Sequence, residues 1–143
     1  MNELNKRYNI IGLSRLGGTS KNEWAVDFLN KPEIIKKLKK IDRIDVVIFL
    51  IGLAHFKGKK RDLESFRDVN LKTLINLISA FEVVGLTPNK FIFSSTISVY
   101  GESLNNSIFD ENYPPKPQSP YAITKYEAEL FLKGDFFKNK WIL

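Results

Sequence analysis

The chain has 143 residues, a formal net charge of +6, no cysteine and one histidine, which excludes disulfides, thiol catalysis, cysteine-based metal sites and a histidine cluster for zinc or iron. With 43% hydrophobic and 27% charged residues, its composition is that of one soluble globular domain, long enough to bury a core. No apolar stretch reaches the ~18 residues of a membrane-spanning helix and the N-terminus lacks the apolar segment of a signal peptide, so we expect a cytoplasmic protein without a membrane partner.

The chain begins with two segments that predict short strands. Residues 9–14 form an apolar run that ends at the polar pair Ser14 and Arg15, as expected of a short buried strand. A loop with two glycines separates this run from residues 24–27, which favour a second short strand.

A helix is predicted next, because Pro32 suits a first helical position and Asn30 can cap the helix. Its lysine-rich stretch, residues 36–40, is interrupted by Leu38 at the spacing of an amphipathic helix, so the lysines are expected on the solvated side. A second basic run occupies residues 57–61. No aromatic residue is interleaved with either run, as a stacking platform for nucleic acid requires, so we expect no nucleic-acid partner.

The middle of the chain predicts a strand and the longest helix. Residues 45–51 are a continuous apolar run rich in β-branched residues, which is typical of a strand in a parallel sheet covered on both faces. The helix is expected over 61–84, ended by Gly85 and Pro88. Asn70 falls within its apolar stripe, and a buried amide needs hydrogen-bond partners. A satisfied core asparagine explains this position as well as a functional one does.

The last third continues the alternation of strand and helix. Residues 90–95 predict a strand, and an irregular loop rich in proline and asparagine follows at 101–117. Ser119 then caps a helix near 120–133. Alternating strands and helices favour right-handed βαβ units, so we expect an α/β fold with a doubly wound parallel sheet, forming one domain over residues 1–143.

Three polar residues of this last third suggest chemistry. Tyr121 and Lys125 lie four apart and so share one face of the predicted helix. Thr96 follows the strand at 90–95, at the end where open α/β sheets bind their ligands. A hydroxyl, a phenol and an ammonium in one place could move a proton to and from a substrate oxygen while a nicotinamide carries the hydride. By itself, the pair Tyr121 and Lys125 is better explained as a surface tyrosine beside a solvated lysine, and only the surrounding motifs favour a functional site.

Five stretches carry a family resemblance. The most specific are residues 93–101, which match a Ser-Ser-x-x-Val-Tyr-Gly strand end, and residues 117–129, which match a Pro-x-Ser-Pro-Tyr-x-x-x-Lys-x-x-x-Glu helix. Weaker matches cover residues 26–28, 47–54 and 69–71. Together they resemble the extended short-chain dehydrogenase/reductase family, the NAD(P)-dependent epimerase/dehydratase group that acts on nucleotide sugars. The resemblance implies a Rossmann-like NAD(P)-binding domain.

The resemblance also implies roles for individual residues. Tyr121 would be the general acid/base, Lys125 would hydrogen-bond the nicotinamide ribose, and Thr96 would hold the reacting sugar oxygen. The residues implied to bind the cofactor are Ser14, Arg15, Asp27, Phe28, Leu50, Ile51, Gly52, Asn70, Ser94, Tyr121 and Lys125. No metal site is implied.

The cofactor is expected to be NAD or NADP. Family members that use NAD tend to end the second strand with an acidic residue that binds the ribose diol. This chain has Ser14 and Arg15 there, and Arg15 could meet a 2′-phosphate, so the sequence favours NADP. A solvated loop arginine is an equally good explanation of Arg15.

Two departures from the family pattern concern the ends of the chain. No Gly-x-x-Gly-x-x-Gly turn is present to seat a pyrophosphate at a helix N-terminus. The apolar run at 141–143 resembles the start of a further strand. We therefore expect a domain truncated at both ends, inactive by itself, that forms a homodimer or needs a complementing fragment.

The reaction is expected to be epimerisation of a nucleotide sugar. Dehydratases of the family carry an acidic pair directly after the threonine, whereas this chain has Ile97 and Ser98 there, which disfavours dehydration. Keto-reduction of a nucleotide sugar is the alternative within the family. A non-catalytic remnant, or half of a split protein, is the alternative outside it.

Overall fold

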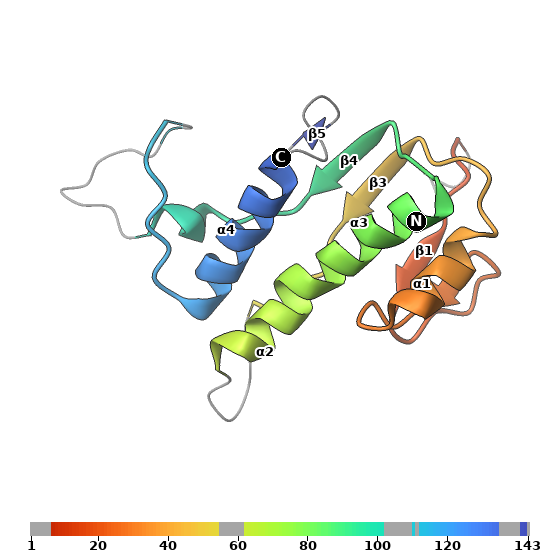
Figure 1. Ribbon diagram of the computed structural model, residues 1–143, viewed down its shortest axis with the longest axis horizontal. Coiled ribbons are helices and arrows are strands. Elements are labelled where there is room, and N and C mark those ends of the chain that lie inside the picture. Colours follow the sequence, from red (N-terminus) through yellow and green to blue (C-terminus); the bar gives the residue numbers. More distant parts are fainter. Residues whose placement is uncertain (1–6, 55–61, 102–109, 111, 135–140, 143) are drawn as a thin grey trace.

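The structure, a computed structural model, describes residues 7–54, 62–101, 110, 112–134 and 141–142. Figure 1 shows strands and helices that alternate along the chain. In chain order the elements are β1 (Gly12–Ser14), β2 (Glu23–Ala25), α1 (Lys31–Leu38), β3 (Val46–Phe49), α2 (Leu63–Arg67), the π-helical segment η2 (Asp68–Lys72), α3 (Thr73–Val84), β4 (Lys90–Phe93), the 3₁₀ turn η3 (Ile97–Tyr100), α4 (Pro120–Lys133) and β5 (Trp141–Ile142).

The predicted elements that carry the polar motifs are all present. The strand predicted at 45–51 is β3, the strand at 90–95 is β4, and the helix at 120–133 is α4. The long helix predicted over 61–84 is a run of α2, η2 and α3. These elements place the carboxyl ends of two strands beside the first turns of α4.

Both strands predicted near the N-terminus are present, at Gly12–Ser14 within the predicted 9–14 and at Glu23–Ala25 in place of 24–27. The run at 9–14 is a strand only over Gly12–Ser14, because its partner β2 is itself three residues long. The basic run at 57–61, His55 and most of the loop predicted at 101–117 lie outside the described residues.

Every strand pair in the described part of the chain is parallel. β1 pairs with β2, with Gly12 opposite Glu23, and β3 pairs with β4, with Val46 opposite Lys90. The helical run α2–η2–α3 connects β3 to β4, and α4 lies between β4 and β5, so parallel strands are joined by helical crossovers as βαβ units require. The described strands form two sheets, β1–β2 and β3–β4–β5, rather than one.

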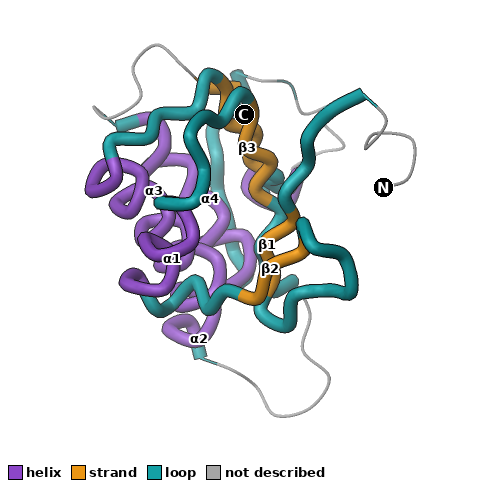
Figure 2. The backbone as a smooth tube through the Cα atoms, turned by 90° about the vertical axis from the view of Figure 1, so that its right-hand side faces the viewer, coloured by secondary structure: helices purple, strands orange, loops and turns teal. Residues whose placement is uncertain are grey.

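The helices cover only one face of these strands. Figure 2 shows the helices on one side of the strands in the part of the chain that is described. On β3, Phe49 is buried, whereas Ile48 is 60% exposed and the following Leu50 is 73% exposed. The expectation of a sheet covered on both faces is therefore wrong for the described residues. Successive side chains of a strand point to opposite faces, and only one of these faces meets helices.

The core lies between the helices and the covered face. The ring of Phe49 stacks on those of Phe91 and Phe93, with centroids 6.0 and 6.1 Å apart. Phe91 is fully buried, which stabilises the fold by ~1.5–3 kcal/mol. The other buried apolar residues of this core are Val26, Phe28, Ile34, Leu38, Leu74, Leu77, Ile78, Ala80, Phe81, Leu86, Ala128 and Leu132. This packing fixes α3 and α4 against the ends of β3 and β4.

Candidate functional site

Lys125 is the centre of the candidate site. It lies on the buried side of α4 with 3% of its surface exposed, and its Nζ lies 4.2 Å from the centroid of the Phe93 ring. A cation over an aromatic face is favourable. No hydrogen bond from Nζ reaches another residue of the described chain. Burial lowers the pKa of Lys125 below its ordinary value, and the charge of Glu129 acts in the opposite direction.

Gly52 brings the turn after β3 close to this ammonium. A Cβ added to Gly52 would lie 3.7 Å from Lys125 Nζ and 3.8 Å from Asn70 Oδ1. The side-chain ends of Lys125 and Asn70 therefore face the same point of the backbone. A side chain at position 52 would occupy the space beside both polar groups.

Asn70 connects this turn to α4. Its Oδ1 accepts a hydrogen bond from the Leu53 backbone N–H at 2.6 Å, and its Nδ2 donates to the Leu53 carbonyl at 3.3 Å. Nδ2 also donates to Thr124 Oγ1 at 2.9 Å. Asn70 is completely buried, so these partners supply what a buried amide needs. Its hydrogen bonds hold the β3 turn at a fixed place relative to α4.

The backbone around Asn70 is π-helical. The segment η2 interrupts an otherwise α-helical run between α2 and α3. Single-turn π-helical segments inside α-helices occur often at functional sites. The sequence pattern predicted a continuous helix here and gave no sign of this segment.

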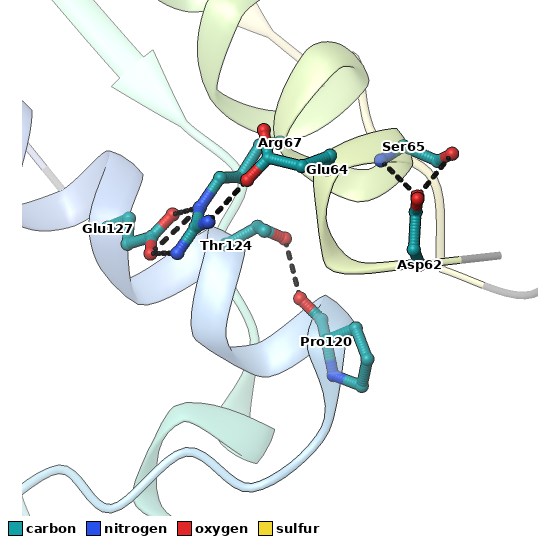
Figure 3. A network of polar contacts seen from close by, with 7 residues as sticks. All are labelled: Asp62, Glu64, Ser65, Arg67, Pro120, Thr124 and Glu127. Carbon is teal, nitrogen blue, oxygen red and sulfur yellow. Dashed lines mark hydrogen bonds and ion pairs between the residues drawn. The ribbon is translucent and has the colours of Figure 1, made fainter.

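Thr124 links Asn70 to the first turn of α4. Its Oγ1 donates a hydrogen bond to the carbonyls of Pro120 at 2.9 Å and Tyr121 at 3.0 Å, and the bond to Pro120 is drawn in Figure 3. Since Thr124 also accepts from Asn70, the backbone that carries Tyr121 is held by the same network as the β3 turn. Sequence reasoning assigned no role to Thr124.

An ion-pair network holds α2 against α4 next to Thr124 (Figure 3). Arg67 donates from Nε and Nη2 to the Glu127 carboxylate at 2.9 and 2.6 Å. Its Nη1 donates to Glu64 Oε1 at 2.6 Å. Such two-point guanidinium–carboxylate contacts fix orientation as well as distance. The network sets the position of α4 relative to the helix that carries Asn70.

Ser95 and Glu129 form a second link between β4 and α4. Ser95 Oγ donates a hydrogen bond to Glu129 Oε1, and Glu129 lies one helical turn after Lys125. Glu129 Oε2 is 3.9 Å from Lys133 Nζ. Glu129 is the last residue of the helix motif at 117–129, but the sequence analysis assigned it no role. Its spacing of four from Lys125 could have indicated an electrostatic influence on the lysine.

Thr96 and Tyr121 lie on neighbouring elements. Thr96 precedes η3, which packs against α4, and its Oγ1 accepts from the Ser98 backbone N–H at 3.3 Å and donates to Ser98 Oγ at 3.3 Å. Tyr121 is half-buried in the first turn of α4. The hydrogen bonds of Thr96 are thus local, whereas the side-chain ends of Lys125 and Asn70 both lie near Gly52.

The other predicted cofactor residues are spread over the ends of the strands. Ser14 and Arg15 are exposed at the end of β1, where Ser14 Oγ donates to the Gly17 carbonyl at 3.2 Å. Asp27 is exposed and its Oδ1 accepts from the Leu29 N–H at 2.9 Å.

The remaining members of that set differ in exposure. The Phe28 side chain is buried in the core. Leu50 is exposed, Ile51 is half-buried, and Ser94 is exposed after β4 with its N–H bonded to the Phe49 carbonyl at 3.2 Å. The strand ends of β1, β3 and β4 thus each contribute predicted residues.

Membrane-spanning helices and metal-binding clusters are both absent from the described residues. No described helix is long and apolar enough to cross a membrane. Within the same residues, no group of three or more His, Cys, Asp or Glu side chains could hold a metal ion.

Comparison with known proteins identifies the family. The sequence model of the NAD dependent epimerase/dehydratase family matches residues 2–134. The dTDP-D-glucose 4,6-dehydratase of Mus musculus is 33% identical over 107 residues, which cover 75% of this chain and 29% of that protein.

Two solved structures are similar as well. The UDP-glucose 4-epimerase of Thermus thermophilus in complex with NAD has a TM-score of 0.74 and 25% identity over 98% of this chain and 47% of that one. RMD from Pseudomonas aeruginosa, complexed with NADPH, has a TM-score of 0.67 and 27% identity over 76% of this chain and 36% of that one. The fold is therefore Rossmann-like α/β. This chain spans less than half the length of each of these proteins, and it belongs to the NAD-dependent epimerase/dehydratase family.

Proposed function

We propose that residues 1–143 form part of an NAD(P)-binding domain and carry the acid–base site of a nucleotide-sugar epimerase. The observation that carries the proposal is the buried Lys125 ammonium beside Gly52. A buried charge is costly unless it is paired and hydrogen-bonded. The described residues give Nζ the face of Phe93 and the charge of Glu129, but no hydrogen-bond acceptor. A ligand with hydroxyl acceptors, such as a ribose diol, would complete its hydrogen bonds.

The residues near Lys125 fit a dinucleotide. The glycine at position 52 leaves open the space next to Nζ that a Cβ would fill, so a ligand can approach the backbone closely. Leu50 and Ile51 precede this glycine at the end of β3. Asn70 fixes the turn that follows it.

The other ligand contacts are proposed from β1 and the segment after β2. Ser14 and Arg15 would face the adenosine ribose, and Asp27 with Phe28 the adenine. An exposed arginine in place of an acidic residue favours a 2′-phosphate, so we propose NADP over NAD.

Tyr121 is the proposed proton donor and acceptor. It lies one helical turn before Lys125. A bound nicotinamide supplies hydride transfer at a sugar carbon. Tyr121 would take up and return the proton of the hydroxyl on that same carbon. Thr96 would hold the oxygen of this hydroxyl once the Thr96 side chain no longer bonds to Ser98. Thr124 and Asn70 would position the backbone of Tyr121.

The residues after Thr96 favour epimerisation over dehydration. Ile97 cannot donate a proton and Ser98 is a weak acid, so neither is suited to expelling a sugar hydroxyl. RMD, which is similar to this chain, is complexed with NADPH, and Arg15 would suit the same cofactor. A nucleotide-sugar keto-reductase that uses NADPH is therefore the second candidate. A non-catalytic role is the outcome if the following test fails.

A chimera tests this proposal. The part of the Thermus thermophilus epimerase that aligns with this chain would be replaced by residues 1–143, and conversion of UDP-glucose would be followed by NMR. We expect turnover, which Tyr121→Phe should lower about 100-fold or more, while Tyr126→Phe serves as the matched control. A folded chimera that binds NAD(H) or NADP(H) but is inactive on every sugar nucleotide tested would overturn the proposal.

The proposed partners are a nucleotide sugar and a protein chain. We propose that the chain acts in the cytoplasm. We also propose that it acts either as a homodimer or with a complementing fragment. Sedimentation of the purified protein, alone and with candidate fragments, would distinguish the two assemblies.

A further inference from the structure

Asn76 of α3 makes a long-range hydrogen bond that the proposed function does not use. Its Nδ2 donates to the Phe28 carbonyl at 2.9 Å, across 48 positions of the sequence. Phe28 follows Asp27 in the segment after β2, which is proposed above to contact the adenine. Because Asn76 is half-buried, water competes less for this bond than for a fully exposed one. A side chain of α3 therefore holds the backbone of the proposed adenine segment.

The other backbone contacts of this segment come from its own residues. The Asp27 carbonyl accepts a hydrogen bond from the Asn30 N–H at 3.0 Å, and Asp27 Oδ1 accepts one from the Leu29 N–H at 2.9 Å. In the part of the chain that is described, Asn76 is the sole donor to the Phe28 carbonyl. Removing the Asn76 amide would therefore leave this carbonyl without a partner from the protein.

The backbone N–H of Phe28 has no partner among the described residues. Phe28 is 8% exposed, yet none of the described hydrogen bonds uses its N–H as donor. Nearly all buried backbone N–H groups are paired, so an unpaired one requires an explanation. A ligand with a hydrogen-bond acceptor would supply the partner, and ring nitrogens of adenine are acceptors of this kind. The free N–H thus fits the proposed dinucleotide.

We propose that Asn76 is a positioning residue for the adenine half of the dinucleotide. It would act through the Phe28 backbone, which it holds where the adenine would bind, without touching the ligand itself. This inference rests on the proposed function, in which Asp27 and Phe28 contact the adenine. It adds a residue whose loss would weaken binding of one half of the cofactor and leave the other half unaffected.

The same helical run also reaches the nicotinamide end of the proposed site. Asn70, in η2, holds the turn after β3 through Leu53. The segment η2 packs against α4, and α3 packs against α1, so the run lies between these two helices (Figure 1). Asn70 and Asn76 would therefore set the two ends of the dinucleotide site from one helical run. Because each acts on a different segment, their effects on binding are separable.

Nuclear magnetic resonance titrations of the ¹⁵N-labelled protein of residues 1–143 test the inference. The probes are adenosine monophosphate and nicotinamide mononucleotide, the two halves of NAD. In the parent protein, the first should shift the Phe28 amide and the second the amides near Gly52. Asn76→Ala and the isosteric Asn76→Asp, whose carboxylate cannot donate, should each weaken binding of adenosine monophosphate about three- to tenfold. The affinity for nicotinamide mononucleotide should stay unchanged.

Two further variants serve as controls. Asn89→Ala removes an Nδ2 hydrogen bond to Asp45 at an exposed site and should leave both affinities unchanged. Asn76→Gln keeps an amide donor and should bind adenosine monophosphate more tightly than Asn76→Ala does. The amide spectrum of each variant shows whether it is folded at the temperature of the titration.

The outcomes separate positioning from a purely structural role. A lower melting temperature of the Asn76 variants, with parental affinity for adenosine monophosphate in the folded protein, would overturn the inference. Equal weakening of both nucleotides would overturn it as well. A parent protein that binds neither nucleotide would contradict the proposed function itself, and the inference would fall with it.

Discussion

At the residue scale, Lys125 shows how much of a site sequence spacing can predict. The spacing from Tyr121 predicted one shared helix face, which α4 confirms. It could not predict that Lys125 would be buried over Phe93, because this depends on the packing of α4 against β4. The contact of Ser95 with Glu129 was likewise beyond prediction, since it joins residues of two elements.

The depressed pKa of Lys125 makes a prediction for stability against pH. Burial lowers its pKa in the folded chain, whereas the unfolded chain has the ordinary value near ~10.4. Between these two values the unfolded state binds more protons, so the free energy of unfolding should rise as pH increases through that window. Lys125→Met should flatten this rise in urea unfolding measured over a pH series, and Lys72→Met, at an exposed lysine, should not. An unchanged slope in Lys125→Met would contradict the assignment.

The charge of Glu129 should be visible in the same titration. Glu129 raises the pKa of Lys125 against the effect of burial, so Glu129→Gln should lower this pKa further. The Lys125 ¹³Cε shift, followed by NMR against pH, reports the change directly. Glu82→Gln, at an exposed site on α3, is the matched control. An equal shift in both variants would remove the specific role of Glu129.

Asn70 should be more important to stability than an exposed asparagine. Replacing it by alanine leaves the Leu53 backbone groups without their side-chain partner and opens a small cavity, so Asn70→Ala should cost ~2–4 kcal/mol. Asn89→Ala removes one exposed hydrogen bond to Asp45 and should cost less than ~1 kcal/mol. Urea unfolding of both variants measures the difference, and equal losses would refute it.

At the element scale, hydrophobic periodicity predicted the identity and order of the main strands and helices. The π-helical segment η2 was not predicted. It coincides with the hydrogen bonds of Asn70 to Leu53 and Thr124, which join distant parts of the chain and leave no local sequence pattern. The apolar run at 45–51 indicated a strand covered on both faces, and it did not predict that one face would lack cover in the described residues. That depends on which other elements pack there, which a single run cannot specify.

The end of α3 provides a prediction about an element boundary. Gly85 has a left-handed φ of 72° with no atom within 4 Å of an added Cβ, so Gly85→Ala changes backbone strain alone. It should destabilise the chain by ~1 kcal/mol. Gly12→Ala meets only the flexible Glu23 side chain and the Asn22 carbonyl at ordinary contact distances, and should cost less. Thermal unfolding of both variants tests the order, and a greater loss in Gly12→Ala would contradict it.

At the scale of the whole molecule, the described residues combine a well-connected polar site with an incomplete sheet. Asn70, Thr124 and Arg67 join α2, η2 and α4 around the end of β3. The same strand exposes one face and one edge. The polar network can therefore hold Lys125 and Tyr121 in place before any ligand is bound, while the opposite side of the sheet still lacks cover.

This division predicts that a polypeptide of residues 1–143 has no measurable epimerase or reductase activity by itself. Acid–base residues accelerate a reaction only when the substrate is held in a reactive geometry. The described residues have no glycine-rich turn at a helix N-terminus to bind a pyrophosphate. Purified protein should give no turnover of UDP-glucose or GDP-sugars with NAD(P) in coupled assays, although its melting curve shows that it is folded. The same residues within the chimera should be active and depend on Tyr121. Robust turnover by the 143 residues alone would mean that the Lys125 region is sufficient to hold both ligands.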